Sequence, residues 1–165
     1  MKTLLTFMLA VISVAGSASA QTADAIYQRA CGPKDIRFVV EQVKGHPPTA
    51  PQPGKALVYF IQKESAPIFI TRVGLDGTWL GVMLHNSYIF ASVEPGEHHA
   101  CAATQDRKNP GGELVHFTAE AGKTYYYLVR GIGGDFATME FGPVDSDEAL
   151  FLIASDPQSI AKLRP

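Results

Sequence analysis

Short apolar runs separated by turn residues fill the middle of the chain. They cover Lys55–Gln62, Ile68–Leu75, Thr78–Met83, Tyr88–Val93, Glu97–Thr104, Glu113–Glu120 and Lys123–Arg130. Their length and regular spacing are typical of β-strands. The unbroken apolar run at Lys55–Gln62 predicts a central strand that is covered on both faces. The pattern as a whole predicts an all-β fold, a single antiparallel β-sandwich.

The turns between these runs predict how neighbouring strands are connected. Asp76-Gly77 separates two β-prone runs and favours a two-residue type I′ hairpin, because both central residues of that turn need a positive φ. Ala121-Gly122 predicts a second hairpin, and Pro95-Gly96 marks another turn.

The residues before this ladder of strands predict an N-terminal arm. Residues 21–29 are expected to form either a short helix or a disordered lead-in. Asp35–Lys44 alternates apolar and polar side chains and predicts a strand. Residues 45–53 contain four prolines, which lack the N–H group that a sheet requires and predict an extended linker. We therefore assign residues 21–53 to an arm and Pro-rich linker, and residues 54–142 to the sandwich core.

The pattern changes towards the C-terminus. Thr138–Phe141 is expected to be a last edge strand. Asp145 can cap a helix, with Glu148 placed as in a capping box, and apolar helix formers follow until Pro157. Ser159–Leu163 is expected to add one further helical turn. Residues 143–165 are therefore predicted to form a C-terminal helical segment.

The first twenty residues have the features of a cleaved signal peptide. Lys2 precedes an apolar stretch, and small residues lead to a predicted cleavage between Ala20 and Gln21. We expect an exported protein, periplasmic or secreted. Lipid attachment at Cys31 is the alternative, but Arg29 does not fit the small-residue box that lipidation needs, so no lipid anchor is expected. No later stretch predicts a membrane span.

Two cysteines, Cys31 and Cys101, remain in the exported chain. In an oxidising compartment the expected outcome is a disulfide that ties the arm to the ladder of strands. Two buried thiols are the alternative interpretation. The remaining length is that of one domain. The chain has 14 basic and 16 acidic residues and a formal charge of −2, and it has no basic run, so no nucleic-acid partner is expected.

Several segments resemble a known family when they are taken in order. These are GKALVYF, the D-G-x-W-x-G of Asp76–Gly81, the Ser87-Tyr88 pair, the V-x-PGEH of Val93–His98 and the EAGKTYYY of Glu120–Tyr127. This order is similar to that of the domain-of-unknown-function 2846 family, which consists of small exported bacterial β-domains. The D-G and P-G-x-H parts also resemble PEGA-type surface β-domains. The resemblance implies an envelope β-sandwich and brings no catalytic residues with it.

Histidines are the main candidates for chemistry. His98, His99 and His116 are the candidate metal ligands, because imidazole is the commonest transition-metal ligand. Successive residues of a strand point to opposite faces, so His98 and His99 should not share one site. We expect His99 to share the face of Cys101, and His98 to face outwards. No metal or cofactor is predicted as resident.

No catalytic residues are predicted. A G-x-S-x-G motif is absent from the sequence, and a hydrolase or metal-binding protein that uses His98 or His99 is only the alternative interpretation.

Aromatic residues offer the better indication of function. Trp79, Tyr88 and Tyr126, together with Asp76 and His98, form the predicted binding surface, because exposed aromatic rings bind sugars and proteins. The expected function is a non-enzymatic envelope module with a glycan or protein partner. A purely structural accessory domain is the third interpretation.

Overall fold

The computed structural model describes residues 22–63, 70–105, 112–132 and 138–164. The predicted signal peptide and the cleavage between Ala20 and Gln21 lie outside these ranges. The elements are α1 (Ala23–Ala30), β1 (Phe38–Val43), β2 (Ala56–Lys63), β3 (Ile70–Leu75), β4 (Thr78–Leu84), β5 (Ser87–Val93), β6 (Gly96–Thr104), β7 (Gly112–Ala119), β8 (Thr124–Ile132), β9 (Thr138–Pro143), α2 (Ser146–Ser155) and β10 (Gln158–Leu163).

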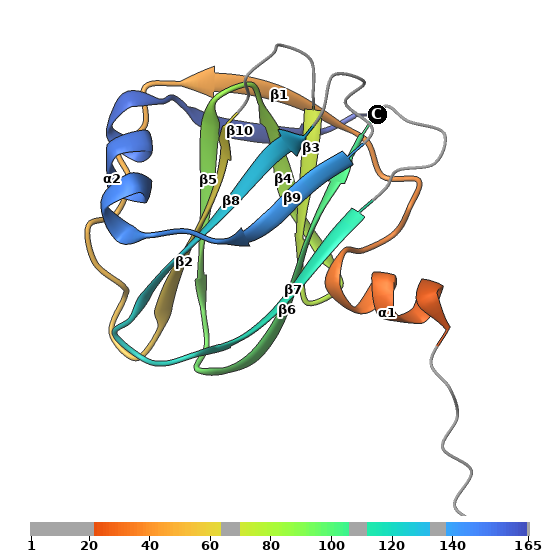
Figure 1. The fold of residues 1–165 in the computed structure, drawn as a ribbon, viewed down its shortest axis with the longest axis horizontal. Coiled ribbons are helices and arrows are strands. Elements are labelled where there is room, and N and C mark those ends of the chain that lie inside the picture. The colour runs from red at the N-terminus through yellow and green to blue at the C-terminus, as the bar shows by residue number, and fades with distance from the viewer. Residues whose placement is uncertain (1–21, 64–69, 106–111, 133–137, 165) are drawn as a thin grey trace, which may run out of the picture.

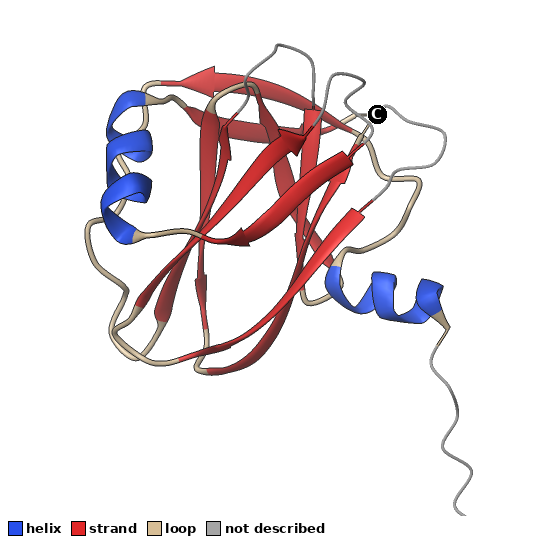
Figure 2. Cartoon of the chain, viewed as in Figure 1, coloured by secondary structure: helices blue, strands red, loops and turns tan. Residues whose placement is uncertain are grey.

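The described strands form two sheets that pack face to face (Figures 1 and 2). The larger sheet has the order β1-β10-β5-β2-β8-β9, and the smaller sheet has the order β4-β3-β6-β7. The predicted all-β sandwich with a short C-terminal helix is confirmed. The sandwich is not antiparallel throughout, since β2 runs parallel to β8. The whole smaller sheet lies between these two strands in the sequence, which gives the long crossover that parallel pairing needs.

Strand β2 is the centre of the larger sheet, as its apolar run predicted. It lies between β5 and β8, and every residue from Ala56 to Gln62 is buried. One face of β2 contributes Val58 and Phe60 to the core between the sheets. The other face contributes Leu57 and Tyr59 to a second core, which is covered by α2. Burial on both faces explains why this strand lacks polar alternation.

The predicted helical turn at Ser159–Leu163 is wrong, because these residues lie in strand β10. β10 pairs antiparallel with β1 from Phe38 opposite Leu163 to Val43 opposite Gln158. The hydrogen bonds between the two strands hold β10 in an extended conformation at the edge of the larger sheet. The sandwich therefore extends beyond residues 54–142 and includes strands from the arm and from the C-terminal segment.

Helix α2 starts where the sequence predicts it. Asp145 is the N-cap, and its Oδ1 accepts a hydrogen bond of 2.8 Å from the backbone N–H of Asp147. Glu148 forms an ion pair with Arg130 of β8. The buried face of the helix packs on the outer face of the larger sheet, which leaves its other face towards solvent.

The first part of the N-terminal arm, α1 and residues 31–36, lies on the outer face of the smaller sheet. Cys31 and Cys101 form the predicted disulfide, with their Cα atoms 5.4 Å apart. The arm approaches β3 so closely that a Cβ atom at Gly74 would lie 2.4 Å from the carbonyl oxygen of Cys31. Trp79 donates a hydrogen bond of 2.7 Å from Nε1 to the carbonyl of Pro33. The arm is thus part of the fold.

Candidate functional site

The turn between β3 and β4 carries the first polar side chain of the candidate site. Asp76 and Gly77 have φ values of 49° and 78°, and both are positive, as the predicted type I′ turn requires. The turn lies beside β6, where the backbone N–H of Asp76 donates a hydrogen bond of 2.8 Å to the carbonyl of His99. This pairing places the Asp76 carboxylate against the start of β6.

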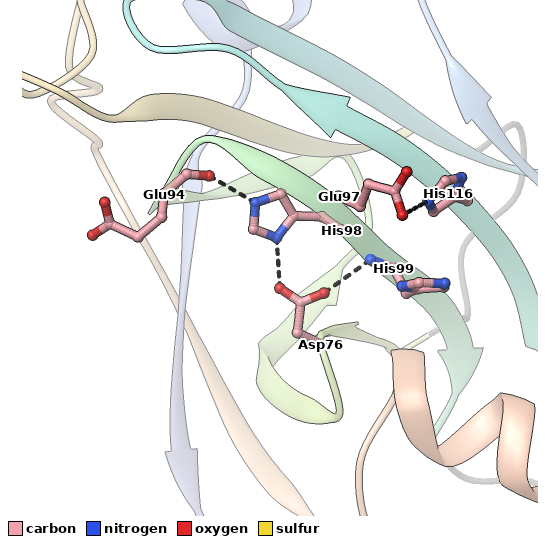
Figure 3. Close-up of polar contacts among 6 residues, drawn as sticks. All are labelled: Asp76, Glu94, Glu97, His98, His99 and His116. Atoms are coloured by element: carbon pink, nitrogen blue, oxygen red, sulfur yellow. Dashed lines mark hydrogen bonds and ion pairs between the residues drawn. The ribbon is translucent and has the colours of Figure 1, made fainter.

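Asp76 joins the two neighbouring histidines in different ways (Figure 3). Its Oδ2 lies 2.6 Å from Nδ1 of His98, and its Oδ1 accepts a hydrogen bond of 2.9 Å from the backbone N–H of His99. The other ring nitrogen of His98, Nε2, lies 2.8 Å from the carbonyl oxygen of Glu94. His98 therefore links the β3–β4 turn to the β5–β6 turn.

The partners of His98 favour its protonated form. A carboxylate and a carbonyl oxygen can only accept hydrogen bonds, so both contacts are satisfied when both ring nitrogens carry a proton. Burial alone would lower the pKa of His98, but its hydrogen bonds to Asp76 and to the Glu94 carbonyl, with the charge of Asp76, raise the pKa above its ordinary value. An imidazolium held in this way has no lone pair for a metal or for a proton from a substrate. The arrangement suits a structural link between two turns.

The prediction that the His98 side chain faces outwards is wrong. Its side chain is only 11% exposed, and its ring lies 5.4 Å from the ring of Phe117, which belongs to the core between the sheets. The alternation itself is confirmed, because Cys101 belongs to the cluster on the opposite, arm-covered face of β6. The sequence could not show which face the second sheet covers and which face the arm covers.

His99 and His116 lie opposite each other on β6 and β7, and their ring centres are 4.8 Å apart. His116 is half exposed, and its Nε2 lies 3.7 Å from Oε2 of Glu97, which shares this face of β6 (Figure 3). Two of the three candidate metal ligands are thus adjacent, and His98 is directed to the other side of the sheet.

The aromatic residues of the predicted binding surface are buried or half-buried in the structure. Trp79 is 8% exposed because the arm covers it, and the Arg72 guanidinium packs over its ring at 4.3 Å from the ring centre. Tyr88 is 1% exposed under the Pro-rich linker, where a Cβ atom at Gly45 would lie 2.0 Å from its hydroxyl. Tyr126 is half-buried and stacks on Tyr59, with ring centres 5.6 Å apart.

The most exposed apolar side chains on α2 are absent from the sequence-based candidates. Phe151 is 70% exposed and Leu150 is 52% exposed, although the same helix buries Ala149, Leu152 and Ile153. The sequence carried only a general signal: Ala149–Ala154 is apolar without a break, and a helix that packs on one sheet cannot bury all of these side chains.

Two further features bear on function. Within the described ranges, no set of three or more His, Cys, Asp or Glu side chains is arranged to hold a metal ion. Neither helix in the described part of the chain has the length and apolar character needed to cross a bilayer.

No protein-family model, characterised protein or solved structure matches this chain, so the resemblance to the domain-of-unknown-function 2846 family stays a hypothesis.

Proposed function

We propose that this protein is an exported, non-enzymatic binding module of the cell envelope, and that it binds a protein partner through helix α2. The observation that carries the proposal is the exposure of Leu150 and Phe151 on a helix that is otherwise anchored to the larger sheet. Large apolar side chains that stay exposed on a packed helix, one of them aromatic, are typical of protein interfaces.

The charges beside this pair indicate what the partner presents. Asp145, Asp147 and Glu148 are exposed at the start of α2, and Glu148 is paired with Arg130. A partner with an apolar pocket and a basic rim would complement this end of the helix. The other predicted partner, a glycan, is less well supported, because the aromatic residues expected to stack on sugars, Trp79 and Tyr88, are buried.

Two features support export. The signal-peptide pattern ends between Ala20 and Gln21. The disulfide between Cys31 and Cys101 is of the kind that persists in oxidising compartments. We expect the exported protein to start at Gln21 and to carry no lipid, which intact mass measurement of the protein from fractionated cells would check.

The test of the binding role uses photo-crosslinking in the cells that make the protein. A photoreactive phenylalanine analogue at position 151 should form an adduct with one envelope protein, and the same analogue at the exposed Thr118 of β7 should not. Leu150→Gln should remove the adduct, and Leu163→Gln, a control at another exposed apolar residue, should leave it. A glycan bound through Phe151 without a protein adduct would contradict the proposal, and so would the absence of any adduct.

A further inference from the structure

The cross-strand pair of His99 and His116 lies on the outer face of the smaller sheet. The two residues are directly opposite in the antiparallel pairing of β6 with β7. Side chains at such positions project from the same face and are the closest neighbours across a sheet. The backbone of two hydrogen-bonded strands therefore holds the rings next to each other, so little conformational entropy has to be lost to bring them together.

The separation of the rings matches that of two imidazoles bound to one ion. With a metal–nitrogen distance of about 2.1 Å, two imidazoles in adjacent coordination positions have ring centres about 4.5–5.2 Å apart, for right-angle and tetrahedral geometry respectively. The observed separation of the His99 and His116 rings is 4.8 Å, with the ring planes inclined at 45°. Rotation about the side-chain bonds then suffices to direct one nitrogen of each ring to a common point.

The surroundings of the pair also suit a cation. The carboxylate of Glu97 lies on the same face, with its Oε2 3.7 Å from Nε2 of His116. The side chains of His116 and Glu97 are 51% and 73% exposed, so an ion can reach them while water fills its remaining coordination positions. His98 differs in that both of its nitrogens are already bonded.

We propose that His99 and His116 form a two-histidine chelate for a divalent transition metal, with Cu²⁺ preferred, on the outer face of β6 and β7. Imidazole ligands suit copper, nickel and zinc, and among the divalent ions of this series Cu²⁺ binds a given nitrogen site most tightly. Glu97 contributes negative charge beside the ion. Because two protein donors leave the other positions to water, the site would exchange its metal readily.

The test is titration of the untagged, disulfide-bonded protein with Cu²⁺ in a non-coordinating buffer, followed by calorimetry and electron paramagnetic resonance. We expect one equivalent that binds more strongly than any further Cu²⁺, and its spectrum should show coupling to two nitrogens. His99→Ala and His116→Ala should each weaken binding by about 100-fold, because each removes the chelate. The double variant should be little weaker than either single variant. His46→Ala, which changes another exposed histidine, should bind as the unaltered protein does.

Two further measurements, on the carboxylate variants and on the folding of all variants, complete the test. Glu97→Gln should weaken binding a few-fold, and Glu113→Gln on β7 should not. Thermal unfolding without metal should show that the four variants at positions 46, 97, 99 and 116 remain folded, since those side chains lie at the surface or half-buried. Binding that is unchanged in His99→Ala or His116→Ala would overturn the proposal. Losses that multiply in the double variant would also overturn it, because they would indicate two independent sites.

Discussion

The carboxylate of Asp76 and the ring of His98 meet at 2.6 Å, and this contact joins the β3–β4 turn to strand β6. The same carboxylate accepts the backbone N–H of His99, and the same ring reaches the Glu94 carbonyl. The His98 ring therefore connects the β3–β4 hairpin turn with the turn between β5 of the larger sheet and β6 of the smaller sheet. Because the side chain of His98 is largely buried, solvent screens this contact less than it screens the surface ion pairs of the molecule.

The protonation of His98 should make stability depend on pH. The pKa of His98 is raised in the folded protein, so the folded state binds this proton more tightly than the unfolded state does. The stabilisation is fully present below the unfolded pKa of about 6.5, and it is lost as the pH rises through the higher folded value. The free energy of unfolding, measured by urea titration from pH 6 to pH 9, should fall over this interval.

The matched variant for this prediction is Asp76→Asn. Asparagine also tolerates a positive φ and can still accept the His99 N–H, but it has no charge. It should lower the pKa of His98, which is measured by nuclear magnetic resonance titration of the ring protons, and should remove most of the pH-dependent fall. A pKa that is unchanged in Asp76→Asn would contradict the assigned role of Asp76.

Because the arm approaches β3 closely, a single added methyl group at Gly74 should lower the unfolding free energy strongly. Gly74→Ala would place a Cβ atom 2.4 Å from the Cys31 carbonyl oxygen and 2.6 Å from the Cys31 Cα. Backbone atoms must then shift, which should cost about 2–3 kcal/mol of unfolding free energy in denaturant titration. Gly142→Ala is the control, because no heavy atom lies within 4 Å of its Cβ position. Equal losses in the two variants would show that the crowding at Gly74 is not responsible.

The disulfide should account for a large part of the stability. The Cys31→Ser, Cys101→Ser double variant opens a link across 70 residues, which should cost about 4 kcal/mol in the chain-entropy description. Trp79 is the only tryptophan and lies under the arm, so its fluorescence should shift to longer wavelength if the arm detaches. Reduction of the unaltered protein should give the same shift. Unchanged emission in both cases would mean that packing alone holds the arm on β4.

The Pro-rich linker should be fixed by one buried hydroxyl. Tyr59 donates a hydrogen bond of 2.5 Å to the Pro48 carbonyl, and burial, together with the nearby Tyr126 and Tyr88, raises the pKa of Tyr59 to about 12. Tyr59→Phe should cost about 1 kcal/mol of unfolding free energy in denaturant titration. Tyr126→Phe, in the same aromatic cluster, leaves the Pro48 contact in place and should cost less. Equal losses in the two variants would show that the hydrogen bond to Pro48 is not responsible.

Local patterns in the sequence predicted local structure well. The Asp76-Gly77 pair predicted a turn that the structure contains, with both φ values positive. The apolar run at residues 55–62 predicted a strand buried on both faces. Asp145 predicted the start of α2. In each case the cause lies within a few residues: turn geometry, side-chain period or a cap.

Features that depend on distant segments were not predictable in the same way. Whether Trp79 is exposed depends on the arm around Pro33, and whether Tyr88 is exposed depends on the linker at Gly45. The strand β10 was mistaken for a helical turn because six residues of mixed polarity have no clear period without their partner β1. Alternation separated His98 from His99 correctly, but it could not show that His116 would lie opposite His99.

The pairing of β1 with β10 sets a limit on the order in which this chain can fold. Glu41 of β1 and Lys162 of β10, which form an ion pair, are separated by 121 residues. A chain that emerges N-terminus first exposes β1 to solvent until β10 has followed, so this edge of the larger sheet can be completed only after β10 is available. Contacts of such long sequence separation form slowly. Removal of β10 would therefore leave β1 without its strand partner, and an unpaired strand edge is prone to aggregate.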